Sequence, residues 1–348
     1  MLVVSLGWGG VGYAHAAPAD EIIASVNGEK ITVHELRESL GLWGGAVPAK
    51  GIPLDKKKEG LNRLIDACLL EQSARAKGLD KTEDFSKLMK QNGQGITINA
   101  LFRREMAFRA KVTEDEIKAE AGKLRKEDKN LSREEARSRA FGVVWGNKVR
   151  QIEEEVIAAA KKDTSPMIDE GAMARIEKGD PMKDNVVLGT AGSSAVLYGD
   201  VKKLLQTVPA GKHGGRELTG NPAMMRNVVN RELTRISLLD YARRQESGDL
   251  KWLKTVQREA ERALLIGLLT GNVVLKGVKV TDKEIGDAYA KHSGMLVRDG
   301  KPIPLPEVKE EIRRIVQGDK RKLAIEKYVG QLRKKAKIKT YGKLITKV

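Results

Sequence analysis

Apolar residues along this chain recur mostly at helical spacing, and only a few short runs alternate as strands do. The stripe Leu61, Leu64, Ile65, Cys68 and Leu69, for example, places one apolar face of a helix toward its neighbours. Helices are predicted at 55–77, 82–92, 98–111, 113–126, 132–162, 224–244, 250–271, 282–291 and 305–335. The pattern therefore predicts a mainly α fold.

Three short segments carry strand signals. Ile22–Val26 is apolar and ends at Asn27-Gly28, a dipeptide typical of tight hairpin turns, and Thr32 then caps a helix. The other two predicted strands are 195–198, followed by a helix capped by Asp200, and 336–341 after the last long helix. We expect these strands to be small additions to a helical body.

The pattern also repeats at a nearly constant offset of 168 residues. Val112–Ile117 returns as Val280–Ile285, each with a Thr-x-x-Glu capping box, and Leu70–Ala74 returns as Leu238–Ala242. We therefore expect two tandem helical modules, each closed by a long C-terminal helix and a short strand. The predicted organisation is a signal peptide at 1–16, module 1 at 17–178, a Gly/Pro-containing linker at 179–192 and module 2 at 193–348. Whether each closing helix packs on its own module or on the other stays open.

The first residues predict export. Met1–Tyr13 contains no charged residue and precedes Ala14-His15-Ala16, which has the small-x-small pattern of a signal-peptidase site. The apolar run is shorter than the roughly 20 residues that span a bilayer. A soluble periplasmic protein is the expected result.

Charge is distributed unevenly over a chain whose net charge is +17. Residues 17–185 contain 31 Lys and Arg against 30 Asp and Glu, whereas residues 186–348 contain 33 against 17. The basic module 2 favours anionic partners such as an anionic surface, and the alternative is a solvated surface that aids solubility. No nucleic-acid-binding motif accompanies the charge, so no nucleic acid partner is expected.

Candidate chemistry is sparse. The single cysteine, Cys68, falls on a buried helix stripe, and His residues are few, so neither a metal site nor a Cys nucleophile is predicted. The chain also contains no phosphate-binding Gly-x-x-x-x-Gly-Lys-Ser/Thr loop. We predict no cofactor.

Several segments resemble a known family. Ala24–Thr32, Leu61–Leu79 and Val112–Ile117 resemble the N-terminal domain of the periplasmic chaperone SurA and of the PrsA foldases. Val308–Arg313 and Lys322–Tyr341 resemble the C-terminal helix and strand that fold back onto the N-terminal helices in that family. The resemblance implies an extracytoplasmic chaperone that binds unfolded secreted or outer-membrane polypeptides.

Members of that family commonly carry a parvulin prolyl isomerase domain before the closing helix. Here only residues 118–130 and 286–304 are available at the two corresponding positions. A minimal domain needs roughly 50 residues, so no isomerase domain fits and no catalytic residue is predicted.

The sequence therefore predicts an ATP-independent holdase that works through its surface. The candidate client-binding residues are Leu42, Trp43, Val47, Ile52, Met224 and Met225. Apolar side chains in connectors, and flexible Met above all, suit promiscuous contacts. The alternative for these residues is that they fill the core of their own module. The alternative functions are a peptidyl-prolyl isomerase and a basic protein that binds anionic surfaces.

Overall fold

The computed structural model describes residues 21–40, 52–206, 221–245, 250–292, 294, 297–298, 301–346 and 348. The fold is mainly α, as the sequence predicts. Contacts divide the chain into two compact units, and neither is a continuous piece of sequence. Unit 1 comprises Met1–Leu42, Ala49–Asp80 and Leu265–Val348, and unit 2 comprises Trp43–Pro48 and Lys81–Leu264.

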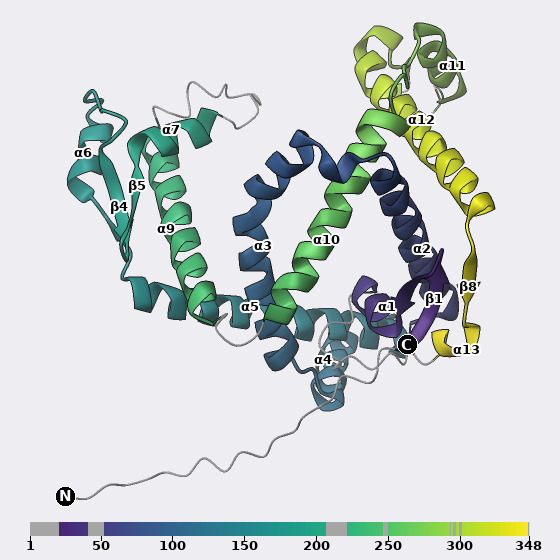
Figure 1. The fold of residues 1–348 in the computed structure, drawn as a ribbon, viewed down its shortest axis with the longest axis horizontal. Helices are drawn as coiled ribbons and strands as arrows, with labels where there is room; N and C mark the ends of the chain where they lie inside the picture. Colours follow the sequence, from purple (N-terminus) through teal and green to yellow (C-terminus); the bar gives the residue numbers. More distant parts are fainter. Residues whose placement is uncertain are drawn as a thin grey trace, which may run out of the picture. The chain divides into compact units, whose positions relative to one another are not determined.

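Unit 1 is built around a β-hairpin from one end of the chain and a helix and strand from the other. In chain order its elements are β1 (Ile22–Val26), β2 (Glu29–Thr32), α1 (Val33–Ser39), α2 (Leu54–Ala76), η3 (Thr270–Val274), α11 (Asp282–His292), β6 (Val297–Arg298), β7 (Lys301–Pro302), α12 (Leu305–Lys335), β8 (Ile338–Thr340) and α13 (Gly342–Ile345), with η2 (Leu79–Lys81) at its border. The main sheet has the order β2-β1-β8, so a strand from the end of the chain lies beside a strand from its beginning (Figure 1).

The β1–β2 turn and the start of α1 form as their residues predict. Asn27 and Gly28 have φ angles of 51° and 92°, the left-handed region that an Asn-Gly turn favours. Thr32 caps α1, and Glu35 completes the capping box. This local geometry directs α1 back along the hairpin.

Unit 2 contains the second β-hairpin. In chain order its elements are α3 (Glu83–Arg109), α4 (Glu114–Glu127), α5 (Arg133–Thr164), β3 (Met167–Ile168), α6 (Glu170–Glu177), β4 (Val187–Ala191), β5 (Ser194–Leu197), α7 (Tyr198–Gln206), α9 (Pro222–Gln245) and most of α10 (Leu250–Leu269). The sheet order is β3-β4-β5. A core of buried residues that includes Met173, Leu188, Val201 and Leu205 joins the sheet to α6, α7 and α9.

The two hairpins share detailed backbone features. Each first strand has an irregularity at one fully buried residue, Ile23 in β1 and Leu188 in β4. The carbonyl of Ile23 accepts a hydrogen bond from Tyr341 N–H at 2.9 Å, and the carbonyl of Leu188 accepts one from Asp169 N–H at 3.0 Å. In unit 1 the donor follows β8, and in unit 2 it follows β3. Each of these strands pairs with the first strand of the hairpin, so the two sheets are completed in the same way.

The helical hairpins α4–α5 and α11–α12 also share their polar contacts. Thr113 and Glu116 form a capping box on α4, and Thr281 and Glu284 make the same hydrogen bonds at the start of α11. Lys148 on α5 lies 2.8 Å from Glu116 and donates to the carbonyl of Lys111. In the first hairpin, Lys148 therefore connects α5 to the start of α4 and to the turn before it.

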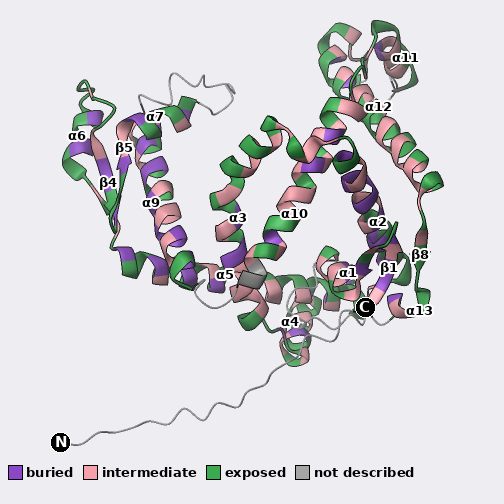
Figure 2. Ribbon diagram, viewed as in Figure 1, coloured by how far each residue is buried: buried purple, intermediate pink, exposed green. Residues whose placement is uncertain are grey.

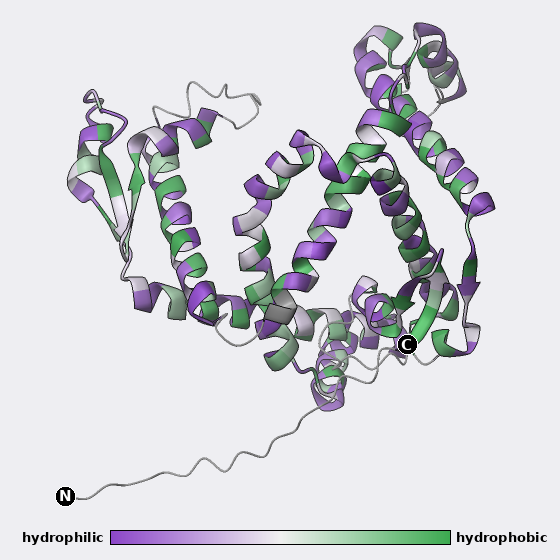
Figure 3. Cartoon of the chain, in the orientation of Figure 1, coloured by the Kyte–Doolittle hydropathy of each residue, from purple (hydrophilic) through white to green (hydrophobic). Residues whose placement is uncertain are grey.

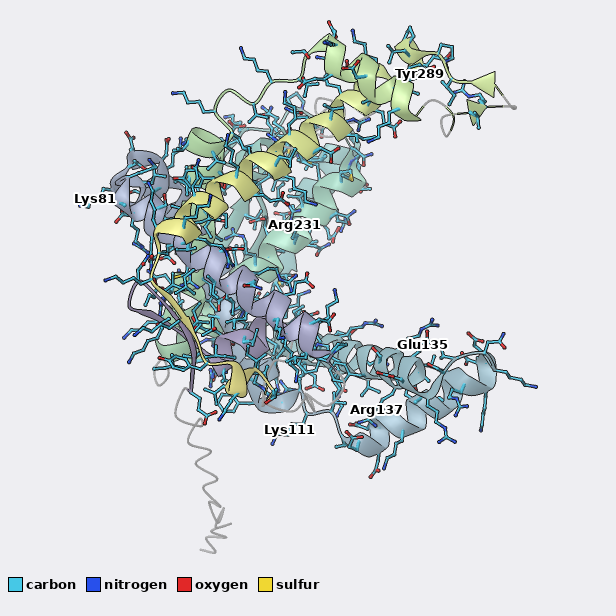
Figure 4. All side chains as sticks on the ribbon, turned by 90° about the vertical axis from the view of Figure 1, so that its right-hand side faces the viewer. Lys81, Lys111, Glu135, Arg137, Arg231 and Tyr289 are labelled. Atoms are coloured by element: carbon cyan, nitrogen blue, oxygen red, sulfur yellow. The ribbon has the colours of Figure 1, made fainter. Side chains whose placement is uncertain are left out.

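The second hairpin repeats the lysine contact, and both hairpins have an ion pair at their outer end. Lys320 on α12 lies 2.6 Å from Glu284 and donates to the carbonyl of Lys279. At the outer ends of the hairpins, Arg137 pairs with Glu114 at 2.6 Å and Lys309 with Asp282 at 3.0 Å. Figure 4 labels Arg137 on α5 and, on α11, Tyr289, whose hydroxyl donates to the carbonyl of Ile303 at 2.7 Å. Hairpin strands, helices and a last strand thus follow one another in a similar order from β1 to β3 and from β4 to β8, although β6 and β7 have no counterpart between α4 and α5.

The closing elements are exchanged between the two halves. Helix α5 and strand β3 come from the first half, yet they pack on α9 and β4 of the second half. Helix α12 and strand β8 come from the second half and pack on α2 and β1 of the first. The predicted module boundaries, 17–178 and 193–348, therefore do not coincide with the compact units.

Three details of the sequence prediction need correction. The predicted linker 179–192 contains β4, because its apolar residues pair with β3 and β5. The helices predicted at 82–92 and 98–111 form one helix, α3, which runs through Gly93 and Gly95 because its flanking apolar residues pack against other helices. The helix expected to be capped by Asp200 begins at Tyr198, so Asp200 lies within its first turn.

Candidate functional site

The predicted client-binding residues differ in location and in burial. Leu42, Trp43 and Val47 lie outside the described residues, and Ile52 is half-buried just before α2. On α9, Met224 is 36% exposed whereas Met225 is fully buried. Adjacent helical positions point about 100° apart, so only one of the two methionines faces solvent. The prediction for Met225 is wrong, because its side chain belongs to the core beside Val201 and Leu205.

Two hollows flank helix α3 in unit 2. The first lies between α3 and α9 and has a volume of about 410 Å³. Its apolar lining comes from Ile98 and Leu238, and its polar lining includes Asn230 and Thr234. The hollow therefore offers an apolar floor next to groups that can hydrogen-bond to a polypeptide backbone.

The second hollow lies between α3 and α10 and has a volume of about 370 Å³. Ile96 and Val256 are buried at its floor, and Ala260 packs against them. At one end Arg103 and Glu259 form an ion pair at 2.5 Å. The carboxamides of Asn92 and Asn99 add donors and acceptors to the lining.

The sequence of α3 explains why both sides of one helix are used. Ile96 and Ala100 are four residues apart and face α10, whereas Ile98 and Leu101 face the side of α9. Gly95 lines the hollow beside α10, where an added Cβ would have no atom within 4 Å. A glycine between two apolar stripes therefore leaves open space along the helix.

Sequence reasoning missed these hollows for a specific reason. It placed a break between residues 92 and 98, and the break separated Asn92 and Gly95 from the apolar positions that follow. The available signal was the continuation of helical spacing from Leu88 through Ile96. Figure 2 shows α3 with buried and exposed turns along its length.

The strongly perturbed carboxyl groups hold the fold and do not line these hollows. The hydrogen bond from Lys148 is the main cause that lowers the pKa of Glu116 to about 2. The hydrogen bond from Lys320 lowers the pKa of Glu284 to about 2 in the same way. Both groups also accept bonds from their helix-capping threonines, so their role is structural.

Possible metal ligands and the cysteine were compared with the requirements of a metal site and a reactive thiol, within the part of the chain that the structure describes. No group of His, Cys, Asp and Glu there could hold a metal ion. Cys68, the single cysteine of the chain, is fully buried and accepts a hydrogen bond from the side-chain amide of Gln72 at 3.4 Å. His34 lies on the surface of α1, 3.3 Å from Glu38.

Comparisons with protein-family models, curated proteins and solved structures found no match to this chain. Among the described helices, none combines the length and the apolar character needed to cross a membrane. The function must therefore be inferred from the residues and contacts described above.

Proposed function

We propose that this protein is an ATP-independent extracytoplasmic chaperone that binds unfolded secreted or outer-membrane polypeptides. The observation that carries the proposal is the pair of apolar-floored hollows along α3. An extended client segment would place apolar side chains in the hollows and bond its backbone to the amides of Asn92, Asn99 and Asn230.

The magnitudes fit reversible holding. Burying one apolar side chain contributes roughly 1.5–3 kcal/mol, and a millimolar to micromolar Kd corresponds to about 4 to 8 kcal/mol. Two or three side chains in shallow hollows therefore give weak binding. A client can then leave by folding, and no nucleotide is needed.

The topology also supports the proposal. The resemblance to SurA and PrsA implies a C-terminal helix and strand that fold back onto the N-terminal domain, and here β8 pairs with β1 while α12 packs on α2. The side chain of Asn27, in the β1–β2 turn, accepts a hydrogen bond from Lys337 N–H at 2.8 Å. The uncharged stretch Met1–Tyr13 supports a periplasmic location.

The test is suppression of aggregation of an unfolded outer-membrane protein, with Gly95→Arg compared with Gly146→Arg. Both glycines are exposed helical residues with open space around an added Cβ, but of the two only Gly95 lines one of the hollows described above. Both variants gain helix propensity of up to about 1 kcal/mol, so a loss of stability would not confuse the result.

We expect wild type and Gly146→Arg to suppress aggregation at a stoichiometric ratio, and Gly95→Arg to need several times more protein. Equal suppression by the two variants would remove the hollows from the proposal. No suppression by wild type would end it. Acceleration of a proline-limited refolding step would favour the isomerase instead.

A further inference from the structure

A third hollow lies in unit 1, between α12 and the turn that follows η3. Its volume is about 370 Å³, and it is lined by Gly277, Val278, Lys279, Lys320, Leu323 and Ala324. Val278 is half-buried, and Leu323 is 63% exposed, so both offer apolar surface at the hollow.

The matching place in unit 2 is filled by the chain itself. The repeated lysine contacts align Lys111 with Lys279 and Lys148 with Lys320, and they therefore align Ala110 with Val278 and Ile152 with Ala324. Ala110 and Ile152 are buried in one cluster with residues of α9. In unit 1 the aligned positions border an open hollow, so this surface has apolar groups that the described part of the chain leaves uncovered.

The charges around the hollow identify its occupant. Lys276, Lys279 and Lys327 are exposed, and Lys327 lies one helical turn beyond Leu323. Within the described residues, none of these three side chains makes an ion pair or a hydrogen bond. Lys320 is already held by Glu284, at 2.6 Å. Asp319 and Glu326, which pairs with Lys322, also lie one helical turn from Leu323, so basic side chains outnumber acidic ones beside the hollow. Figure 3 shows the hydrophilic residues along α12.

We infer that this hollow binds segments of unfolded polypeptide in which acidic residues alternate with apolar ones. Apolar side chains fill the space beside Leu323 and Val278, and carboxylates face the three free lysines. Opposite charge steers such segments to the site and disfavours basic ones. This inference rests on the proposed function and assigns a client class to the basic part of the chain.

The test uses the full chain and three labelled peptides with the same leucine spacing, separated by Asp, by Asn or by Lys. The variants are Lys279→Glu with Lys327→Glu, and Leu323→Gln, which introduces the residue that the first half carries at the aligned position, Gln151. The control is Lys126→Glu with Lys129→Glu, which makes the same net-charge change at exposed lysines of unit 2. Fluorescence anisotropy measures each Kd.

At low salt we expect the Asp peptide to bind about tenfold or more tightly than the Lys peptide, with the Asn peptide between them. The double charge reversal at the hollow weakens Asp-peptide binding about tenfold, Leu323→Gln weakens it roughly fivefold, and the control stays within about twofold. Equal Kd values for the hollow and control variants would overturn the inference.

Two further readouts separate this inference from related explanations. Vesicles of equal parts phosphatidylglycerol and phosphatidylcholine are tested with the same variants. Loss of vesicle binding without loss of peptide binding would overturn the polypeptide assignment. Aggregation suppression that survives the hollow variants, together with unchanged peptide binding, would remove this site and leave the chaperone proposal standing. Absence of suppression by wild type would remove the chaperone proposal instead.

Discussion

Helix α5 in unit 2 and helix α12 in unit 1 occupy equivalent positions but are buried to different degrees. Beyond its contact with the preceding helix, α5 buries Ile152, Val156, Ala160 and Thr164 against α3 and α9. The described buried residues of α12 are Val308 and Ile312, both under α11. Figure 2 shows the remainder of α12 as intermediate and exposed.

The polar contacts between α5 and α9 are likewise more buried than those between α12 and α2. In unit 2 the hydroxyls of Thr164 and Ser237 meet at 2.6 Å and are both buried. In unit 1 the hydroxyls of Ser73 and Tyr328 meet at 2.7 Å and are half-buried, and Arg333 pairs with Asp66 at 2.5 Å. Helix α5 therefore has a mainly apolar interface with α9, whereas α12 has a more exposed and more polar interface with α2. The more exposed interface leaves surface free for binding.

The largest expected loss of folding stability comes from truncating the matched buried side chains, Ile23 and Leu188. Each is fully buried at the same place in its hairpin, so Ile23→Ala and Leu188→Ala should each cost about 2–5 kcal/mol. Hydrogen exchange should show the loss of protection in unit 1 for the first variant and in unit 2 for the second. Val143→Ala, at a position 40% exposed, is the control and should stay within about 0.5 kcal/mol.

Loss of protection in both units from either variant would contradict the division of the chain into two units. In the wild type, we expect the amides of α5 to exchange more slowly than those of the second half of α12, because slow exchange follows burial.

A smaller loss of stability is expected when one hydroxyl is removed from the Thr164–Ser237 pair or from the Ser73–Tyr328 pair. Ser237→Ala leaves a buried interface with one hydrogen bond fewer and should cost about 1–2 kcal/mol. Ser73→Ala should cost about 0.5 kcal/mol or less, because water can replace the lost partner of Tyr328. Urea unfolding of each variant measures the difference. Equal costs would contradict the difference in burial between the two hydroxyl pairs.

The smallest expected change in stability comes from protonation of Glu116 and Glu284, and it should be similar in the two units. Both have a pKa of about 2 in the folded protein against an ordinary value of 4.5. A lowered pKa stabilises the fold above about pH 4.5, and this contribution is lost as pH falls toward 2. The two groups are exposed to screening by solvent, so the loss should be modest and should decrease with salt.

The lysine partners provide the test. Lys148→Met should raise the pKa of Glu116 toward 4.5, and Lys320→Met should do the same for Glu284, as followed by carboxyl carbon chemical shifts during acid titration. Lys118→Met removes an exposed lysine 3.9 Å from Asp115 and should move neither value. If only one of the two glutamates responded, the matched contacts of the halves would not be equivalent in solution.

Much of the local structure followed from the sequence. The Asn27-Gly28 turn, the capping boxes of Thr113 and Thr281, and the long helix Leu305–Lys335 formed as predicted, because their signals lie within a few neighbouring residues. The prediction failed where packing decided. Gly93 and Gly95 did not end a helix, and Met225 turned into the core. The hollows also depend on residues from separate helices, such as Ile98 and Leu238, which no local pattern joins.

The sequence by itself determined that this chain would be mainly helical, with capped helices and a few short strands. Only the tertiary structure decided that β8 pairs with β1 and that β3 pairs with β4. The physical reason is that both hairpins present a similar open edge, so either closing strand satisfies the same backbone hydrogen bonds. The choice depends on contacts summed over whole helices, Tyr328 against Ser73 in one unit and Thr164 against Ser237 in the other.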